Sequence, residues 1–319
     1  AMLIGPALMA TASFLTALSP TFTLVLAAQF MAGAGSCLWS TAREIAAVDV
    51  VKPEHRGRML SGFMGMASVG TAVGPAVGGV VALSGAGLST ESGIPDSRGP
   101  TGQTRRTTPM TGQAFRIDAE ARRRYWARSL VGWPTMRDAP PNAGHRAVAQ
   151  LSGLGLVDGV ITQNVDRLHQ AAGSPRVIDL HGRLDQVICL ACGQVSSRDT
   201  VHRRLVDANP RWSVDAVAAQ ADGDADVPAA AVATFHVVDC EACDGTLKPD
   251  VVYFGDSVPR DRVDLAHEWI DQALSLLVLG TSLEVYSGRR FVLRAASRGL
   301  PIAIVNQGPT RGEIGRAHV

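Results

Sequence analysis

Net charge and lysine are both scarce in this chain. Its 319 residues include 30 Lys and Arg against 29 Asp and Glu, a formal net charge of +1, so we expect no nucleic acid as a partner. Lys52 and Lys248 are the only lysines, and we attribute the excess of Arg to the coding bias of a GC-rich genome. Five cysteines and 46% hydrophobic residues exclude a disordered chain, a collagen and a disulfide-dense secreted scaffold. The length suits one large domain or two ordinary ones.

Charge is missing altogether from two long stretches near the start. Residues 1–42 and Met59–Thr90 contain no Asp, Glu, Lys or Arg. Within them, Phe22–Ala42 and Met59–Leu83 each reach the roughly 20 apolar residues that a membrane span needs. A signal peptide does not fit, because no basic segment precedes the apolar stretch and the stretch is repeated. We expect apolar membrane-type helices in residues 1–83, with a soluble Gly/Ala-rich helical hairpin as the alternative.

Small residues crowd these apolar stretches, as they do where membrane helices pack closely. The run Gly70–Gly79 resembles the fifth-helix motif of major facilitator superfamily transporters. Gln29–Gly35 is similar to part of their fourth helix, without its usual leading Arg, and Asp49–Arg58 is similar to the loop between the two. This resemblance covers only a small part of a transporter. We therefore expect a fragment without transport activity, and membrane association only through residues 1–83.

The later part of the chain opens with a glycine-rich motif. The apolar run Val80–Ser84 leads into Gly85-Ala86-Gly87, and glycine lets a backbone approach a pyrophosphate closely. Many tight turns contain Gly-x-Gly, but together with Glu91–Arg98 the motif resembles the cofactor-binding loop of sirtuins, the NAD-dependent protein deacylases. Most sirtuins have an aromatic residue where Ser97 stands. The resemblance implies that this segment binds NAD through Gly85, Ala86, Gly87, Ser89, Asp96 and Arg98.

The next two motifs carry the groups expected to do chemistry. Thr162–His169 follows the strand-like run Val157–Ile161, and Val177–Gly182 contains a histidine directly after another apolar run. By resemblance, this His181 is the catalytic base, a task that suits imidazole because its ordinary pKa lies near working pH. A lone histidine is more often structural or exposed. The resemblance places the remaining catalytic and NAD-contacting residues of these motifs at Gln163, Asn164 and Asp166.

Three later segments extend the resemblance. Leu276–Leu279 and Pro301–Val305 look like parallel strands that end in loops for ribose and phosphate, where ligands of open α/β sheets bind. These loops supply the expected NAD contacts Gly280, Thr281, Ser282, Asn306, Gln307 and Gly308. Leu247–Asp256 resembles the strand and loop on which sirtuins lay an extended peptide through backbone bonds. There the expected peptide contacts are Val252, Tyr253, Phe254 and Gly255.

Four of the five cysteines form two C-x-x-C pairs, Cys189 with Cys192 and Cys240 with Cys243. Each pair can bind one side of a tetrahedral zinc ion, whereas redox chemistry or a disulfide is the alternative. The spacing between the pairs exceeds that of a usual zinc ribbon. Sirtuins carry such a zinc module with a long insertion, to which Ala208–Ala233 is similar. We expect one closed, structural zinc site.

Three further segments bear on the acyl group that the resemblance implies. Arg124–Arg128, Gly132–Pro134 and Val285–Gly288 are similar to a bacterial and mitochondrial subgroup of sirtuins noted for lipoamide and other unusual acyl groups. Tyr125 and Arg128 also have the spacing with which another subgroup contacts acidic acyl chains. The alternative is an ordinary amphipathic helix with an exposed Arg.

The resemblance implies an α/β fold, a Rossmann-like parallel sheet with a small zinc-binding module at about residues 183–250. We assign the sirtuin catalytic domain to residues 84–312 and the transporter-like fragment to residues 1–83. The implied activity is NAD-dependent removal of acyl groups from protein lysines, giving nicotinamide and acyl-ADP-ribose. ADP-ribosyl transfer to protein is the alternative within the family, and an inactive membrane fragment the alternative outside it. The enzyme part is expected in the cytoplasm, and at a membrane if residues 1–83 belong to the same protein.

The two parts of the chain conflict where they meet. The positive-inside rule places Arg43–Arg58 in the cytoplasm, so a span starting at Met59 would deliver Gly85 to the outside, away from cellular NAD. We therefore expect the junction near Val80–Leu83 to be an artificial fusion of two reading frames. Residues 313–319 translate a string that contains a common sequencing-adapter sequence, so we expect an adapter-derived tail that is no part of the fold.

Overall fold

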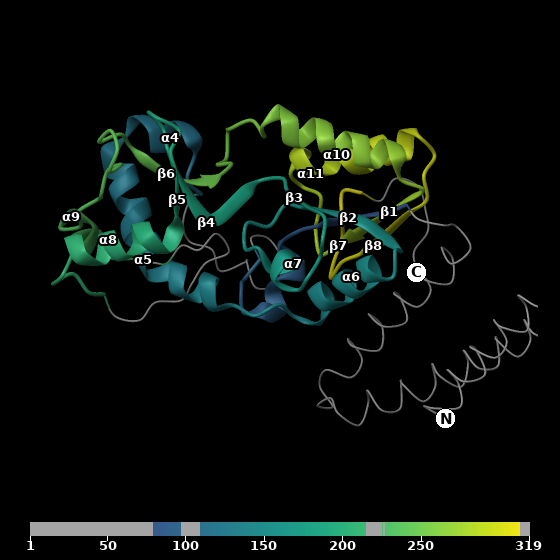
Figure 1. The fold of residues 1–319 in the computed structure, drawn as a ribbon, viewed down its shortest axis with the longest axis horizontal. Helices are drawn as coiled ribbons and strands as arrows, with labels where there is room; N and C mark the ends of the chain where they lie inside the picture. Colours follow the sequence, from purple (N-terminus) through teal and green to yellow (C-terminus); the bar gives the residue numbers. More distant parts are fainter. Residues whose placement is uncertain (1–78, 97–108, 215–224, 226, 313–319) are drawn as a thin grey trace, which may run out of the picture. The chain divides into compact units, whose positions relative to one another are not determined.

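A computed structural model of the chain describes residues 79–96, 109–214, 225 and 227–312 (Figure 1). Over these ranges, every helix is too short or too polar to cross a membrane. Residues 1–78, which hold most of the expected membrane-type helices, lie outside the described part. The last residues of the apolar run Met59–Leu83 are described, and they form a strand instead of the end of a helix.

A five-stranded parallel sheet forms one half of the described structure. Its order is β3-β2-β1-β7-β8. The strands are β1 (Val80–Ser84), β2 (Val157–Thr162), β3 (Val177–Asp179), β7 (Ser275–Leu279) and β8 (Ile302–Val305). All residues of β1 and β7 are buried, as expected for central strands of a parallel sheet covered on both faces. The parallel strands expected from the sequence are thus confirmed.

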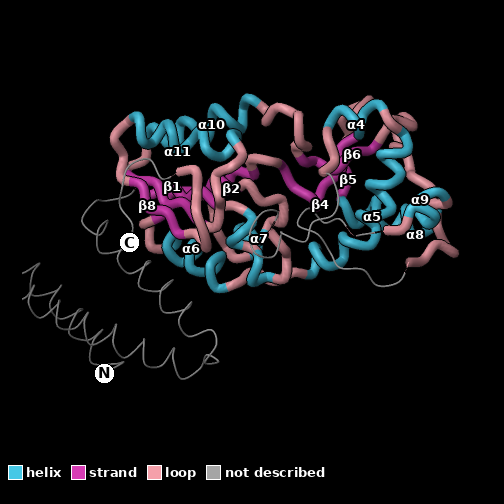
Figure 2. Tube along the Cα trace, turned by 180° about the vertical axis from the view of Figure 1, so that it is seen from behind, coloured by secondary structure: helices cyan, strands magenta, loops and turns pink. Residues whose placement is uncertain are grey.

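Helices cover both faces of this sheet (Figures 1 and 2). They are α6 (Ala143–Gly153) and α7 (Leu168–Ala171) on one face, and α10 (Arg260–Gln272) and α11 (Tyr286–Ser297) on the other. Leu83, Ile161 and Val278 share one apolar core with Ile270 of α10 and Phe291 of α11. We call the parallel sheet with these four helices the large-sheet half.

A second half is built on a three-stranded antiparallel sheet of order β5-β4-β6. Its strands are β4 (Gly182–Cys189), β5 (Val195–Ser197) and β6 (Leu247–Val251), and its helices are α4 (Gly112–Ile117), α5 (Ala119–Asp138), α8 (Arg198–Ala208) and α9 (Ala229–Ala233). Trp126 and Trp133 of α5 pack with Val201 and Leu205 of α8 in one core. We call this part the small-sheet half; α4 and α5 add to the residues 183–250 expected from the sequence.

Strand β4 connects the two halves. It begins directly after His181 at the edge of the large sheet and ends at Cys189. Gly182 pairs with Val251 of β6 and has a φ of +84°, and a Cβ there would lie 2.0 Å from the Asp250 carbonyl oxygen. Only glycine fits so close an approach at a positive φ, so this residue fixes how β4 leaves the large sheet.

Polar caps set the start of several helices. Asp118 accepts hydrogen bonds from the backbone of Glu120 and Ala121 at the start of α5. Asn142 and His145 form a reciprocal capping box at the start of α6. These side chains satisfy amides that have no partner inside their helices. Because His145 also packs against His169 and lies near Ser89, the cap of α6 becomes part of the site described below.

Candidate active site and metal centre

Each strand of the large sheet leads into residues that the sequence places in the site. Gly85 follows β1, Gln163 follows β2, His181 lies shortly beyond β3, Gly280 follows β7 and Asn306 follows β8. The carboxyl ends of parallel strands lie at one edge of the sheet, and this edge is where open α/β sheets bind ligands. The structure therefore brings together segments that are far apart in the sequence.

The loops after β1 and β7 touch backbone to backbone. The Gly87 amide donates to the Gly280 carbonyl at 2.8 Å. A Cβ at Gly85 would lie 2.6 Å from Thr281 Cβ, and one at Gly280, whose φ is +58°, would lie 2.3 Å from the Leu88 amide nitrogen. The short helical turns Ala86–Leu88 and Thr90–Ser92 continue this loop. Glycine is required at these positions because a side chain would separate the loops.

A hydrogen-bonded cluster joins the loops after β1 and β2. Asn164 Nδ2 donates to the Gly85 carbonyl at 3.0 Å and to Ser89 Oγ at 2.9 Å. Ser89 Oγ donates to Asp166 Oδ2 at 2.6 Å, and the Leu168 amide donates to Asp166 Oδ1 at 3.0 Å. Three predicted NAD-contacting residues thus form one unit, whose carboxylate and amide groups suit the hydroxyl groups of a sugar.

Two buried histidines lie behind this cluster. His169 Nε2 is 2.8 Å from Ser84 Oγ, which in turn donates to Thr162 Oγ1 at 2.9 Å. The rings of His145 and His169 meet edge to face with centroids 5.0 Å apart. Burial lowers the pKa of His169 to about 3, with a smaller effect from His145, and burial also lowers the pKa of His145. Both rings are therefore neutral near pH 7.

The sequence motifs assign no role to these inner residues. His145 Nε2 lies 3.5 Å from Ser89 Oγ, which places the histidine behind the cluster of Ser89, Asn164 and Asp166. The capping pattern Asn142–His145 is a local signal that could have marked the start of α6. No local pattern links Ser84 to Thr162 and His169, because these residues meet only when β1 pairs with β2.

His181 has both ring nitrogens in contact with polar groups. Its Nδ1 is 3.0 Å from the Gln163 carbonyl oxygen, and its Nε2 is 2.8 Å from Ser287 Oγ. Its own carbonyl accepts the Val252 amide at 2.8 Å. Burial lowers the pKa of His181 to about 4, a shift that the bond to Gln163 opposes and the Arg290 charge assists. The ring is therefore neutral near pH 7 and can accept a proton.

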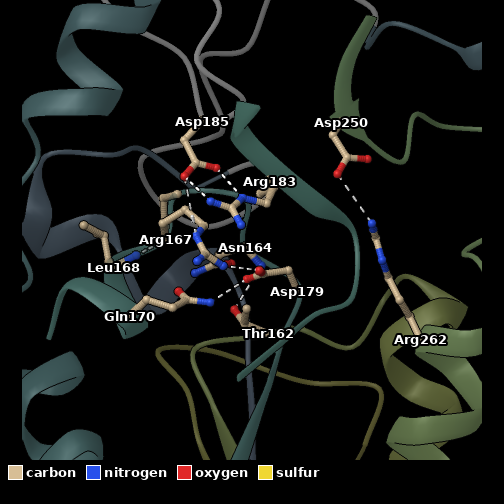
Figure 3. A network of polar contacts seen from close by, with 11 residues as sticks. Thr162, Asn164, Arg167, Leu168, Gln170, Asp179, Arg183, Asp185, Asp250 and Arg262 are labelled. Carbon is tan, nitrogen blue, oxygen red and sulfur yellow. Dashed lines mark hydrogen bonds and ion pairs between the residues drawn. The ribbon is translucent and has the colours of Figure 1, made fainter. Parts of the chain in front are cut away.

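A network of ion pairs connects the segments on either side of His181 (Figure 3). Arg167, which has a positive φ, pairs with Asp179 at the end of β3, and Gln170 Nε2 donates to the same carboxylate at 2.9 Å. Arg183 and Asp185 of β4 form a bidentate pair, and Arg167 Nε lies 3.7 Å from Asp185. These contacts tie the loop after β2 to β3 and β4, so they fix the chain that carries His181.

The expected peptide-binding loop follows β6. The Val252 amide is bonded to the His181 carbonyl, and the Phe254 carbonyl accepts the Gly112 amide at 3.0 Å. Phe254 is 47% exposed, whereas Tyr253 is buried, with ring centroids 5.2 Å from Phe115 and 5.6 Å from Tyr125. Gly255 follows with a φ of +83°. The loop is thus joined directly to the base at one end and presents one aromatic side chain to solvent.

Tyr125 and Arg128 both lie inside the small-sheet half. Tyr125 packs edge to face against Phe115, and Arg128 Nε donates to the Ala225 carbonyl at 2.6 Å. Arg128 is only 8% exposed, so the alternative of an exposed arginine on an amphipathic helix is wrong. A contact of this pair with an acyl chain remains a prediction.

The four cysteines of the two C-x-x-C pairs converge. Their sulfur atoms all lie within 4.8 Å of one another. Cys189 Sγ is 3.5 Å from Cys243 Sγ, and Cys192 Sγ is 3.8 Å from Cys240 Sγ. These separations are far beyond the roughly 2.0 Å of a disulfide, so the disulfide alternative is wrong for this structure. A set of four thiolates at such spacing is compatible with one structural zinc ion.

Some predicted contacts lie at the rim of the site or outside the described part. Gln163 Nε2 donates to Thr281 Oγ1 at 3.1 Å, which links the loops after β2 and β7. Asn306 Nδ2 donates to the Gly308 carbonyl at 3.1 Å. Asp96 is the last residue of the described segment 79–96. Arg98 lies beyond it, outside the described residues. Ser282 and Gln307, two further predicted NAD contacts, lie in the loops after β7 and β8.

Comparison with known proteins identifies the family. Residues 85–287 match the family model described as Sir2 family. The NAD-dependent protein deacetylase 1 of Streptomyces coelicolor is 57% identical over 236 residues, which cover 74% of this chain and 79% of the relative. The chain belongs to the Sir2 family. Another Sir2 relative, the NAD-dependent protein deacetylase of Xanthomonas campestris, is 55% identical over 232 residues, or 72% of this chain and 79% of the relative.

Solved Sir2 structures have the same fold. One, of a Sir2 protein with a p53 peptide and NAD+, matches with a TM-score of 0.57 and 32% identity over 73% of this chain and 82% of the other. Another, with a deacetylated p53 peptide and 3′-O-acetyl-ADP-ribose, has a TM-score of 0.59 and 32% identity over 73% and 84%. The expected Rossmann-like α/β sirtuin fold is confirmed.

The beginning of the chain matches a different family model. Residues 1–90 match the Major Facilitator Superfamily, and this match shares residues 85–90 with the Sir2 match. In the structure, the shared residues belong to the loop after β1 in the large-sheet half. Residues 79–84 of this match include β1, and residues 1–78 lie outside the described part.

Proposed function

We propose that this chain is an NAD-dependent protein deacylase that removes acyl groups from lysine side chains. The observation that carries the proposal is the position of His181, whose Nδ1 lies 3.0 Å from the Gln163 carbonyl at the same sheet edge as the cluster of Ser89, Asn164 and Asp166. The names of its Sir2 relatives supply the reaction class. The residues at this edge fit NAD. The backbones of Gly87 and Gly280 are in contact, and neither residue has a side chain that would block a phosphate group from the backbone.

The residues have separate tasks in this proposal. NAD held by the loops after β1, β2 and β7 would supply an activated ribose carbon for the acyl oxygen and nicotinamide as the leaving group. His181 accepts the proton of a ribose hydroxyl at Nε2, the nitrogen that does not face the Gln163 carbonyl. Asn164 and Asp166 orient the ribose through the amide and carboxylate groups that Ser89 already aligns. One water molecule is consumed, and the products are free lysine, nicotinamide and acyl-ADP-ribose.

The peptide is held by the loop after β6. Val252 and Phe254 use their backbone in bonds to His181 and Gly112, so the loop is rigid before a substrate arrives. An extended peptide beside it places its acyl-lysine near His181, because the same loop is bonded to that residue. We further propose that Tyr125 and Arg128 shape the acyl site and that the enzyme belongs to the subgroup that accepts longer acyl chains.

The four cysteines hold one zinc ion with a structural role. Four thiolates complete a tetrahedral site and leave no position for a substrate. We assign the catalytic unit to residues 84–312, which act in the cytoplasm. Residues 1–83 are a transporter-like segment joined to it artificially, a proposal supported by the matches of two unrelated family models that overlap only over residues 85–90. Resistance of the whole chain to alkaline extraction from membranes would show instead that the two parts function together.

Nicotinamide release by the full chain with acetyl-lysine peptides tests the function. We expect release that depends on both NAD and peptide, and a loss of roughly 100-fold or more in His181→Ala, the size of a general-base contribution. His236→Ala is the matched control, because the described hydrogen bonds of His236 use its backbone. Unchanged nicotinamide release by His181→Ala would contradict the assignment of His181 as the general base. Release with ADP-ribose attached to protein, without deacylation, would establish the transferase alternative.

A further inference from the structure

Ser287 contacts Nε2 of His181, the nitrogen that accepts the proton in the proposed reaction. It lies in the first turn of α11, and its Oγ is 2.8 Å from His181 Nε2. The two residues are separated by 106 positions in the sequence. Neither the C-x-x-C pairs nor the glycine motifs point to this serine, and the proposed reaction assigns it no task.

The direction of this hydrogen bond follows from the other side of the ring. The Gln163 carbonyl near Nδ1 can only accept, so Nδ1 carries the hydrogen of the neutral imidazole. Nε2 then has a lone pair and no hydrogen. Ser287 Oγ must therefore donate its hydrogen to Nε2, the atom that takes up a proton in the proposed reaction.

The start of α11 is fixed in this position by close packing. A Cβ at Gly288 would lie 2.6 Å from the Gln163 side-chain carbonyl carbon, so the helix rests directly on that side chain. Gln163 also supplies the carbonyl that faces His181 Nδ1. One residue thus supports both the base and the helix that carries Ser287. This packing consequently fixes the contact between Ser287 and His181 in the free enzyme.

We propose that Ser287 caps the lone pair of His181 in the free enzyme and is displaced when NAD binds. The inference rests on the proposed function, in which a ribose hydroxyl donates to the same nitrogen. An imidazole nitrogen has one lone pair in the plane of the ring, so it cannot accept both hydroxyl groups in full. Part of the free energy of NAD binding is therefore used to break the Ser287 bond, and the serine tunes the affinity for NAD.

Ser287→Ala in the full chain tests the cap by two measurements. Calorimetry is expected to show NAD binding roughly fivefold tighter than in the wild type, the fold-change that corresponds to one ordinary net hydrogen bond. Nitrogen NMR of labelled histidine is expected to show the His181 Nε2 resonance moving toward that of a nitrogen without a bonded donor. With saturating NAD, the two proteins should give the same resonance, because the ribose hydroxyl then donates to Nε2 in both.

Ser297→Ala is the matched control, because Ser297 lies in the last turn of the same helix and donates to the Arg294 carbonyl. It should leave both measurements unchanged. NAD binding in Ser287→Ala that is equal or weaker than in the wild type overturns the cap, as does a resonance difference that persists with NAD. A wild-type chain that binds no NAD contradicts the proposed function and also the displacement, even where the resonances of the free proteins differ.

Discussion

The two halves of the described structure hold their polar groups in different ways. In the large-sheet half, Ser84 Oγ lies 2.8 Å from His169 Nε2 and donates to Thr162 Oγ1, and Asn164 Nδ2 donates to the Gly85 carbonyl. In the small-sheet half, the fully buried Arg198 stacks over the rings of Trp126 and Trp133 at 4.7 and 5.5 Å, and its Nε and Nη1 have no hydrogen-bond partner in the described residues. We infer that the first half is stable through its own bonds, whereas the second depends on its metal.

The position of β4 makes this difference important for activity. The strand starts beside His181 and ends at Cys189, so the base and the cysteine cluster are attached to one element. Loss of order in the small-sheet half should reach the base through this strand and through Val252. The predictions that follow test how independent the two halves are.

The largest effect is expected from removal of the zinc ion. Cys240→Ser or a strong chelator should unfold the small-sheet half, because structural zinc contributes roughly 10 kcal/mol or more in small zinc domains. Hydrogen exchange should become fast in β4, β6 and α8 and stay slow in β1 and β7. Cys37→Ser, at the fifth cysteine, is the control. Equal exchange in both halves after chelation would contradict the comparison.

Acid should weaken the large-sheet half through its buried histidines. The pKa of His169 is about 3 in the folded chain and about 6.5 when unfolded. Between these values the unfolded chain binds a proton that the folded chain excludes, so this contribution to stability is complete above pH 6.5 and is lost as the pH falls toward 3. The loss is roughly 3 kcal/mol at pH 4.5.

The variant that tests this is His169→Gln. Its free energy of unfolding should depend less on pH between 6.5 and 4.5 than that of the wild type, although it is less stable at pH 7. His236→Gln, in the small-sheet half, should keep the wild-type dependence. An unchanged slope in His169→Gln would show that this histidine does not exclude a proton.

The contact between the β1 and β7 loops can be tested without a polar change. Gly280→Ala places a Cβ 2.3 Å from the Leu88 amide at a positive φ, which should separate the loops and weaken NAD binding by roughly tenfold or more. Gly299→Ala is the matched control, because Gly299 also has a positive φ but nothing within 4 Å of an added Cβ. Equal NAD affinity in the two variants would contradict a preformed site.

These glycines also show what the sequence could and could not predict. The loops at the strand ends were predicted because each motif is local: Gly85–Gly87 follows an apolar run, and so does Gly280. Ser287 lies in the quoted segment Val285–Gly288, but its contact with His181 was not predicted, because the two residues meet only when α11 packs on the large sheet. Tyr125 was predicted as an acyl contact from its spacing to Arg128, which remains a prediction, whereas its packing against Phe115 and Tyr253 was not predicted. Spacing within one helix does not determine which neighbours fold against it.

The smallest effect is expected from a distant charge. Arg290 in α11 helps to lower the pKa of His181, after the larger effect of burial. Arg290→Gln should therefore raise the pKa of His181 and move the acid limb of kcat/KM upward by a fraction of a pH unit, because the base must be neutral to act. Arg298→Gln, at the other end of α11, should leave the limb in place. A downward move in Arg290→Gln would contradict the sign.

The most direct test of the central claim is the stoichiometry of the reaction. Purified full-length chain is mixed with NAD and an acetyl-lysine peptide, and nicotinamide, free lysine peptide and acetyl-ADP-ribose are counted in the same sample. We predict one of each per turnover with the wild type and none above background with His181→Ala. Free lysine peptide that forms without NAD, or nicotinamide released without deacetylation, would contradict the account.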